Sequence, residues 1–342
     1  MSAAYPNNFP IILSAVLGGG KDKKPSGSQK IGTVSENPTE EKSSEKESGN
    51  KTSETEKSDS APVKEGTEEK ETAPVQTEYR VGDILMDGGM KIVYVASGVY
   101  TEENEFMQPK DGKQYIFMQF AFENTSSSDA SISSFNFECY ADGYNTEQHF
   151  GGDDDFSATL SSGRATTGFV YFEVPVDAES VEVEYETNIF TEKKIKFLYE
   201  GEKDSGYTPA LDVKASADAY HVGQTAESSK LKITYLSCKE TISDNVFLQP
   251  EEGNHFVTCE FEFENVGSSD ESVSSLSFDC FADGMACAAS YLLDDNLSAT
   301  LSAGRKTKGT VTFEVPDAAE IVEVEYLSNY WTSKRVIFTV EY

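Results

Sequence analysis

The sequence predicts an all-β protein built from two similar β-sandwich domains behind a polar N-terminal stretch. Three observations support this prediction. The C-terminal part of the chain is an internal duplication, each copy alternates apolar and polar residues with a period of two, and the N-terminal part lacks core-forming residues. The chain has 342 residues, enough for two or three domains that each bury a core.

Residues 1–17 form a short segment of their own. Positions 9–17 (FPIILSAVL) are apolar, but they reach only about half the length of a membrane-spanning helix. No Lys or Arg precedes Lys21, and no cysteine near residue 18 is available for lipid attachment. Two interpretations remain open: a degenerate signal sequence, or the end of a membrane helix that begins upstream of Met1. The glycines and basic residues that follow the apolar run favour the second.

Residues 18–77 consist mainly of Ser, Thr, Glu, Lys, Pro and Gly, with almost no large apolar side chain. Such a segment cannot bury enough surface to offset the entropy lost on ordering. We therefore expect a disordered linker over 18–77, acting as a surface stalk; a phosphorylated regulatory tail is the alternative.

The duplication is the strongest signal in the sequence. Residues 79–199 align without a gap to residues 220–340, with about 50 identical pairs. Matching segments include YRVG and YHVG, QFAFEN and EFEFEN, ECYADG and DCFADG, and FEVP in both copies. We call the copies repeat 1 (78–200) and repeat 2 (220–342), with a linker over 201–219.

Within each repeat the apolar residues alternate as in half-buried strands. The clearest runs are Ile116, Met118, Phe120, Phe122 and Val257, Cys259, Phe261, Phe263. Turn signals separate such runs: Asp142-Gly143 and Asp283-Gly284 supply positive φ, as do Gly163 and Gly304, and Pro175 and Pro316 end strands.

Roughly six to eight short strands per repeat are most economically closed as a two-sheet, immunoglobulin-like sandwich. A small barrel is the alternative. The predicted fold class is therefore all-β: two tandem immunoglobulin-like β-sandwiches after a disordered N-terminal stalk. The polar linker over 201–219 predicts that each repeat folds alone.

The order of these motifs resembles a known family. YxVG, an aromatic strand ending in EN, an ADG turn, a leucine and glycine before a basic residue, and FEVP are together similar to the telokin-like, immunoglobulin-like extracellular domain of Gram-positive surface proteins and lipoproteins. The resemblance covers both repeats. It implies the fold and an extracellular, cell-surface-anchored location, and hardly any function, because its motifs are turns and strands.

The formal net charge of −32 argues against nucleic acid and against direct binding to anionic lipid headgroups. Residues 21–78 carry 10 basic and 14 acidic residues, so most of the excess lies on the two repeats. Solubility is the simplest interpretation, and recognition of a basic partner is the alternative.

The five cysteines, Cys139, Cys238, Cys259, Cys280 and Cys287, are an odd number, which argues against a disulfide framework. Cys139 alternates with Phe135 and Phe137, and Cys259 with Val257 and Phe261, so both are expected to face a core. No C-x-x-C spacing supports a zinc or redox site.

Catalysis finds no support in the sequence. His149, His221 and His255 each align with a residue that is not histidine in the other copy, and no Ser/His/Asp or Cys/His set emerges. The paired carboxylates Glu182/Glu184 and Glu323/Glu325 alternate with valines, which indicates the solvent face of a strand. We therefore predict no enzyme activity, no catalytic residues, no cofactor and no metal.

Four further features have both a structural and a functional interpretation. The acidic loops Asp153, Asp154, Asp155 and Asp294, Asp295, Asn296 could hold calcium or simply be solvated. Arg164 and Arg305 occupy the same place and suggest a salt bridge or a turn-fixing hydrogen bond, with a ligand-facing arginine as the alternative. Tyr330 and Trp331, which match Ile189 and Phe190, close a sandwich edge or form a contact surface. The divergent connections 144–152 and 285–293 are where the copies would differ in what they bind.

These features predict a non-catalytic, extracellular binding or adhesion module of a bacterial cell surface. The expected partner is a surface or host protein or a glycan, with no nucleic acid, contact with the membrane only through an N-terminal anchor, and a monomeric chain. The alternative is an accessory or substrate-binding subunit of a surface enzyme or transport system; a hydrolase is the third hypothesis.

Overall fold

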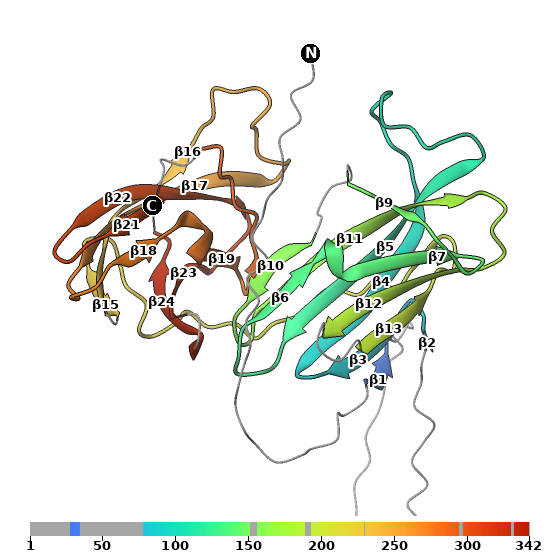
Figure 1. Cartoon of the computed structure of the whole chain (residues 1–342), viewed down its shortest axis with the longest axis horizontal. Helices are drawn as coiled ribbons and strands as arrows, with labels where there is room; N and C mark the ends of the chain where they lie inside the picture. The colour runs from blue at the N-terminus through green and yellow to red at the C-terminus, as the bar shows by residue number, and fades with distance from the viewer. Residues whose placement is uncertain are drawn as a thin grey trace, which may run out of the picture.

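The computed structural model describes residues 28–34, 78–150, 156–188, 193–228, 230–293, 297–329 and 332–341. The described residues contain strands and two short 3₁₀ helices, η1 (Ser134–Asn136) and η2 (Ser275–Ser277), and no α-helix. Figure 1 shows two all-β domains side by side. The predicted all-β fold of two tandem sandwiches is confirmed.

Repeat 1 is a sandwich of two sheets. One sheet runs in the order β3 (Asp83–Asp87), β4 (Met90–Tyr100), β5 (Lys113–Asn124), β11 (Ala165–Pro175), and β9 (Glu147–His149) also pairs with β11. The other runs β2 (Glu78–Tyr79), β13 (Lys193–Leu198), β12 (Val181–Asn188), β7 (Phe137–Ala141), β8 (Tyr144–Asn145). A small pair, β6 (Ala130–Ser133) and β10 (Ser157–Leu160), completes the domain.

Repeat 2 reproduces this arrangement. Its first sheet runs β15 (Thr225–Ser228), β16 (Leu231–Thr241), β17 (Asn254–Asn265), β22 (Lys306–Pro316). The facing strands run β20 (Met285–Ala286), β19 (Phe278–Ala282), β23 (Val322–Asn329), β24 (Lys334–Thr339), and β18 (Glu271–Val273) pairs with β21 (Ala299–Leu301).

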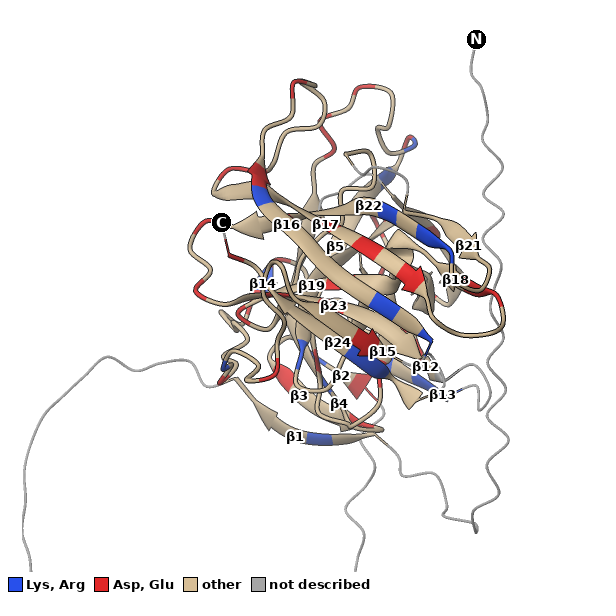
Figure 2. Ribbon diagram, turned by 90° about the vertical axis from the view of Figure 1, so that its left-hand side faces the viewer, with Lys and Arg blue, Asp and Glu red and all other residues tan. Residues whose placement is uncertain are grey.

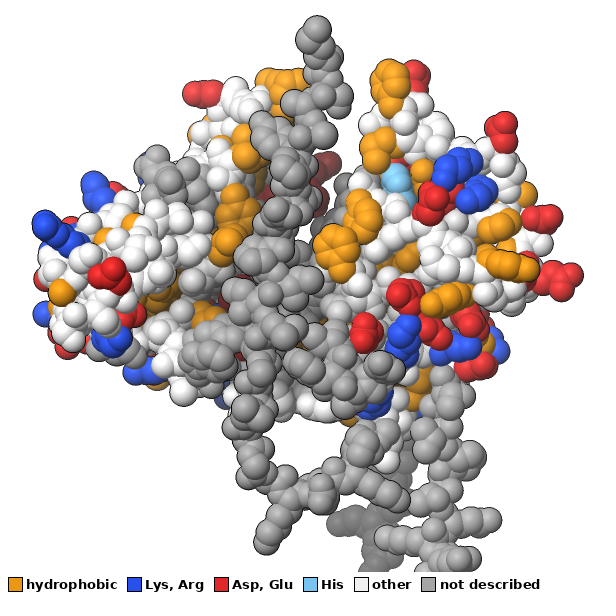
Figure 3. Space-filling view, in the orientation of Figure 1, with side chains coloured by type: hydrophobic (Ala, Val, Ile, Leu, Met, Phe, Trp, Pro, Cys, Tyr) orange, Lys and Arg blue, Asp and Glu red, His pale blue; other side chains and the backbone are white. Residues whose placement is uncertain are grey.

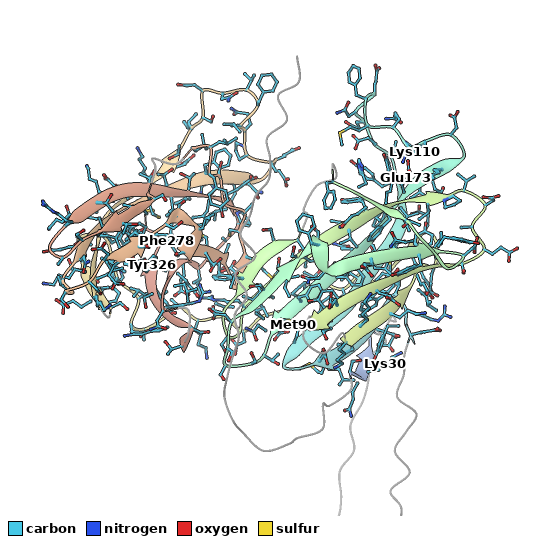
Figure 4. The ribbon with its side chains drawn as sticks, viewed as in Figure 1. Lys30, Met90, Lys110, Glu173, Phe278 and Tyr326 are labelled. Atoms are coloured by element: carbon cyan, nitrogen blue, oxygen red, sulfur yellow. The ribbon has the colours of Figure 1, made fainter. Side chains whose placement is uncertain are left out.

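Each core is built around the same aromatic stack between the two sheets. In repeat 1 the ring centroids of Tyr94 and Phe120 lie 5.0 Å apart, and in repeat 2 those of Tyr235 and Phe261 lie 4.9 Å apart. Figure 4 shows Phe278 and Tyr326 within the core of repeat 2, with ring centroids 4.9 Å apart. The two-residue alternation in the sequence thus places matching rings between the sheets.

The predicted turns are present, and the structure explains their residues. Asp142 and Asp283 have φ of 50° and 47°, and Gly143 follows with φ of 80°. The Asp142 carboxylate accepts hydrogen bonds from the backbone of the residues just before β12, and Asp283 does the same before β23. The turn therefore needs an acidic residue that tolerates positive φ. Pro175 and Pro316 are the last residues of β11 and β22, as predicted.

The N-terminal stretch differs from expectation at one point. Residues 29–33 of the predicted disordered linker form β1 (Gln29–Thr33), which pairs antiparallel with the edge strand β3. Lys30 makes an ion pair with the buried carboxylate of Asp83 (Figure 4 labels Lys30). Strand pairing satisfies backbone groups and requires no apolar side chain, so composition alone could not reveal β1. Residues 1–27 and 35–77, which hold the short apolar segment and most of the linker, lie outside the described residues.

The linker between the repeats packs against repeat 1. Its strand β14 (Lys203–Asp204) pairs with β4, and the Ser205 amide donates to the carbonyl of Val95. Farther along, a Cβ atom added to Gly284 would lie only 2.6 Å from Val213, so this part of the linker is in close contact with repeat 2.

The two repeats are joined by a short parallel bridge. Ala165 on β11 pairs with Met285 on β20, and the Ala165 amide donates to the carbonyl of Gly284 over 3.0 Å. This bridge connects one sheet of each repeat into a single sheet that also includes β1. Whether each repeat folds alone stays a prediction.

Beside this bridge lies a buried charge cluster, and it corrects one prediction. Glu323 and Glu325 were expected on a solvent face, but they are 1% and 2% exposed. Arg164 of repeat 1 lies within 2.5 Å of Glu323 and 2.8 Å of Glu325. The outer face of β23 is covered by repeat 1, whereas Glu182 and Glu184 on β12 are only half-buried and pair with lysines of β13. The two glutamate pairs follow the same local sequence pattern. They differ in burial because only Glu323 and Glu325 are covered by the other repeat.

A second arginine completes the cluster. Arg335 on β24 pairs with Asp129 of repeat 1 over 3.0 Å and with Asp279 of its own repeat over 2.7 Å. Arg335 also lies 3.5 Å from Glu325, and its counterpart Lys194 pairs with Glu138 and Glu184, which match Asp279 and Glu325 of the other repeat. Both arginines are nine-tenths buried at this interface.

Candidate binding surface

Each repeat carries a long loop with an exposed phenylalanine at its tip. In repeat 1 the loop between β4 and β5 presents Phe106, which is 96% exposed. In repeat 2 the loop between β16 and β17 presents Phe247, which is 89% exposed. Exposed phenylalanine rings cost solvation free energy, so their repetition at the same place in both copies favours a role in contact.

The loops hold these rings with the same hydrogen bonds. In repeat 1 the Phe106 amide donates to Asn104 Oδ1 over 3.0 Å, and the Met107 amide donates to the Asn104 carbonyl. The side-chain amide of Gln108 donates to the carbonyls of Glu102 and Asn104 over 2.7 Å and 3.0 Å. These bonds close a compact turn from which the ring projects.

Repeat 2 repeats every one of these contacts. The Phe247 amide donates to Asn245 Oδ1 over 3.0 Å, and the Leu248 amide donates to the Asn245 carbonyl. Gln249 Nε2 donates to the carbonyls of Ser243 and Asn245. The motif N-x-F-x-Q-P therefore forms the same hydrogen-bonded turn in both repeats, with the phenylalanine at its exposed tip.

The base of each loop is tied to the sheet by the same glutamate. The Lys110 amide donates to Glu173 on β11 over 2.9 Å, and Figure 4 shows these two residues below the loop. In repeat 2 the Glu251 amide donates to Glu314 on β22 over 2.7 Å. Burial opposes ionisation of Glu173, but hydrogen bonds from Lys113 and Lys110 outweigh it and keep the pKa of Glu173 below its ordinary value.

Repeat 1 supports its loop with a buried pair that repeat 2 lacks. Glu102 Oε2 lies 2.8 Å from His149 Nε2, and the His149 ring stacks on Tyr115 with centroids 4.0 Å apart. A hydrogen bond from the Asn104 amide is the largest of several contacts that keep the pKa of Glu102 below its usual range. In repeat 2, Ser243, Ser290 and Phe256 stand at the places of Glu102, His149 and Tyr115. His149 is thus a structural partner of the loop.

Both loops lie at the end of the molecule opposite β1 in Figures 1 and 2. Figure 3 shows hydrophobic side chains at the tips of both domains on this side. The flanking residues are acidic and exposed: Glu103 and Glu105 in repeat 1, and Asp244 in repeat 2. The resulting surface, which we call the tip surface, consists of residues 103–107 and 242–248 and combines apolar tips with acidic flanks.

Several predicted site residues fall elsewhere. Asp153–Asp155, Asp294–Asn296, Ile189, Phe190, Tyr330 and Trp331 lie outside the described residues. In the divergent connections, Tyr144 and Phe150 are exposed, and Phe150 contacts Phe135 with ring centroids 5.3 Å apart. Phe135 was expected in the core beside Cys139, but η1 turns it outward to 79% exposure.

Arg164 and Arg305 have opposite surroundings. Arg164 is buried against repeat 2, with its guanidinium 4.8 Å from the Phe281 ring centre, whereas Arg305 is exposed. The predicted salt bridge therefore exists at Arg164. In both copies the arginine carbonyl accepts from a buried asparagine amide, so the turn itself is fixed by backbone bonds.

In the parts of the chain that the structure describes, no group of three or more His, Cys, Asp or Glu side chains is placed to hold a metal ion. His221 and His255 lie near single carboxylates, those of Glu341 and Asp317. The same described parts contain no helix that is long and apolar enough to cross a membrane.

Sequence reasoning overlooked the tip surface. The sequence does contain a signal for it. Residues 97–103 differ from their counterparts 238–244 at every position, but the Asn, Phe, Gln and Pro that follow, at 104, 106, 108 and 109, are identical in the other repeat. An exposed aromatic retained inside an otherwise divergent loop marks function better than a retained core residue does.

Comparison with known proteins identifies a family and several solved structures of low sequence identity. No curated protein matches the chain. Among solved structures, the candidate lipoprotein ycdA of Bacillus subtilis is 14% identical with a TM-score of 0.28; the match covers 33% of this chain and 36% of that one. The yjhA protein of Bacillus subtilis is 15% identical with a TM-score of 0.30, covering 36% and 99%. An uncharacterized β-sandwich protein of Clostridium difficile is 9% identical with a TM-score of 0.25, covering 38% and 99%.

The family assignment comes from the sequence of both repeats. Residues 79–195 and 220–336 each match the family described as a domain of unknown function (DUF4352). The two matches coincide with the two sandwiches and together span more than half of the chain. The chain therefore belongs to the DUF4352 family and carries its domain twice in tandem.

Proposed function

We propose that this protein is a non-catalytic binding or adhesion module at the outer surface of a bacterial cell, and that it engages its partner through the tip surface. The observation that carries the proposal is the pair of exposed rings, Phe106 and Phe247, presented by identical hydrogen-bonded turns. Aromatic anchors of this kind supply much of the binding free energy in protein interfaces.

The chemistry of the tip surface favours a protein partner. Phenylalanine offers no hydrogen bond, so each tip suits an apolar pocket. The acidic flanks favour basic residues around that pocket and disfavour anionic lipid headgroups. A partner with two apolar pockets, or a repeating partner, would use both loops at once and gain affinity through avidity.

The surface location rests on the resemblance stated for the motifs of the two repeats. The alternative role, as an accessory or substrate-binding subunit of a surface enzyme or transport system, uses the same tip surface. The identity of the captured partner distinguishes the two.

Photo-crosslinking from the tips tests the proposal. Benzoyl-phenylalanine replaces Phe106 or Phe247 in the full chain, and the protein is irradiated with bacterial wall extract or host mucus. We expect both positions to link to the same partner protein. The control places the same amino acid at Phe135, which is also exposed but lies outside both loops.

Affinity for that partner is then measured. Removing one aromatic anchor typically costs about 2 kcal/mol, or roughly a 30-fold loss of affinity. We expect that loss for Phe106→Ala and for Phe247→Ala, and little change for Phe135→Ala. Unchanged binding by the double variant Phe106→Ala/Phe247→Ala would overturn the proposal.

A further inference from the structure

The four cysteines of repeat 2 lie in two facing pairs. Cys238 on β16 is directly opposite Cys259 on β17, and their Sγ atoms are 3.5 Å apart. Directly opposed residues on antiparallel strands have Cα atoms roughly 4.5–5.5 Å apart, which lies inside the span of a disulfide.

A β-bulge produces this pairing. In β16 the register shifts between Tyr235 and Ser237, so Cys238 turns toward the core side that Cys259 occupies. Repeat 1 has the same bulge between Tyr94 and Ala96, and there Ser97 faces Met118. The backbone geometry is thus common to both repeats, and only repeat 2 places two thiols on it.

The second pair spans the β19–β20 hairpin. Phe281 pairs with Ala286, and the next step of this register sets Cys280 opposite Cys287. The Cys287 amide donates to the Cys280 carbonyl over 2.9 Å, which confirms that the two residues face each other. In repeat 1 the matching positions hold Cys139 and Thr146, so Cys139 faces a hydroxyl.

We propose that repeat 2 contains two disulfide bonds in its oxidised form, Cys238–Cys259 and Cys280–Cys287, and that Cys139 stays a free thiol. The odd cysteine count that argued against disulfides is then explained by the single cysteine of repeat 1. This inference concerns the fold and is independent of what the tip surface binds.

The bonds form by exchange with an external disulfide, either a small molecule or an oxidoreductase. The Cys238 thiolate attacks one sulfur of that disulfide and releases the other as a thiolate. The Cys259 thiol then attacks Cys238 Sγ, its proton passes to the departing sulfur, and the second half of the external disulfide leaves as a thiol. Repeat 2 is oxidised by two electrons per bond, and each external disulfide is reduced to two thiols.

Cys238 is suited to begin this exchange. It is half-buried and therefore more accessible than the fully buried Cys259. A hydrogen bond from the Cys259 thiol lowers the pKa of the Cys238 thiol to about 7, although burial opposes this. In the second pair Cys287 is half-buried, whereas Cys280 is buried and burial raises the pKa of its thiol. Cys287 is therefore the residue that attacks the external disulfide first.

Mass spectrometry of the purified full chain tests the inference. The reduced protein is equilibrated with oxidised glutathione, alkylated in denaturant, and digested with trypsin and Glu-C. We expect the five alkylated cysteines of the reduced chain to fall to one, Cys139. One cross-linked product should join the peptides of Cys238 and Cys259, and the peptide with Cys280 and Cys287 should lack two hydrogen atoms.

Matched variants restore the residue that repeat 1 has at each place. Cys238→Ser should make Cys259 alkylatable and leave the Cys280–Cys287 bond, whereas Cys287→Thr should do the reverse. Cys139→Ala should leave both bonds, and the oxidised chain should melt at a higher temperature than the reduced one. Five alkylated cysteines after oxidation, or a link between Cys259 and Cys280, would overturn the inference.

Discussion

Arg164 and Arg305 stand at the same place in two copies of one domain, and only one of them joins the domains. Each follows a glycine of positive φ and precedes a long strand. Arg164 is buried between Glu323 and Glu325 of the other repeat, whereas Arg305 lies in solvent. A duplication copies local structure, but each copy meets a different neighbour, so equal residues acquire unequal roles.

The sheet edges show the same asymmetry. In repeat 1 the edge strand β3 is covered by β1 from the N-terminal stretch. In repeat 2 the equivalent strand β15 pairs with β16, and no other strand within the described ranges pairs with it. Edge strands are open to further pairing, so the two repeats differ in how their edges are protected.

The largest expected effect separates the two arginines. Arg164→Ala leaves two buried carboxylates without their main partner, and we expect the free energy of unfolding to fall by about 3–5 kcal/mol. Arg305→Ala should change it by less than about 0.5 kcal/mol. Urea unfolding of the full chain measures both. Equal losses for the two variants would show that the interface contributes little.

A smaller effect should be equal in the two repeats. Asn124 Nδ2 donates to the carbonyls of Ser128 and Leu160, and Asn265 Nδ2 donates to the matching carbonyls, all within 2.8 Å. Replacing either asparagine with Ala leaves a buried leucine carbonyl, that of Leu160 or Leu301, without this donor and should cost about 1–3 kcal/mol in the free energy of unfolding. Thermal or urea unfolding checks this, with Asn145→Ala, at an exposed site, as the control. A loss of stability for only one of the two asparagine variants would show that the two cores do not depend on this residue equally.

The smallest effect is a pH dependence of the interface. Burial opposes ionisation of Glu323, but hydrogen bonds from Arg164 and the Ser216 amide outweigh it and lower its pKa. This stabilisation is complete above the unfolded-state pKa of about 4.3 and is lost as the pH falls through the lowered folded-state value. Asp279 behaves in the opposite way, because burial raises its pKa despite Arg335. Its protonation therefore adds stability as the pH falls.

The opposite pH dependences of Glu323 and Asp279 predict a maximum in the free energy of unfolding as a function of pH. As the pH is lowered from about 7, the free energy of unfolding should first rise through protonation of Asp279 and then fall below about pH 4 as Glu323 is protonated. Urea unfolding at a series of pH values measures this. Asp279→Asn should remove the rise and keep the fall. A monotonic curve in the wild type that Asp279→Asn leaves unchanged would contradict the assignment.

Much of the fold could be predicted because its signals are local. The alternation in β5 and β17, the positive φ at Asp142 and Asp283, and the strand ends at Pro175 and Pro316 depend on neighbouring residues in the chain. Because the two copies align without a gap, a strand or turn predicted in one copy is supported when the same pattern occurs at the matching positions of the other. The tip surface could also have been predicted from the sequence, because Asn104, Phe106 and Gln108 recur at the matching positions as Asn245, Phe247 and Gln249.

The amino-acid sequence by itself determined the two sandwiches, their turns and their core faces, since these follow from side-chain period and backbone preference. Only the tertiary structure decided that β1 covers β3, that Glu323 and Glu325 are buried, and that Cys238 faces Cys259. Each of these depends on the pairing of segments distant in sequence. The alternation that places Glu323 on the outer face of β23 cannot reveal whether water or the other repeat covers that face.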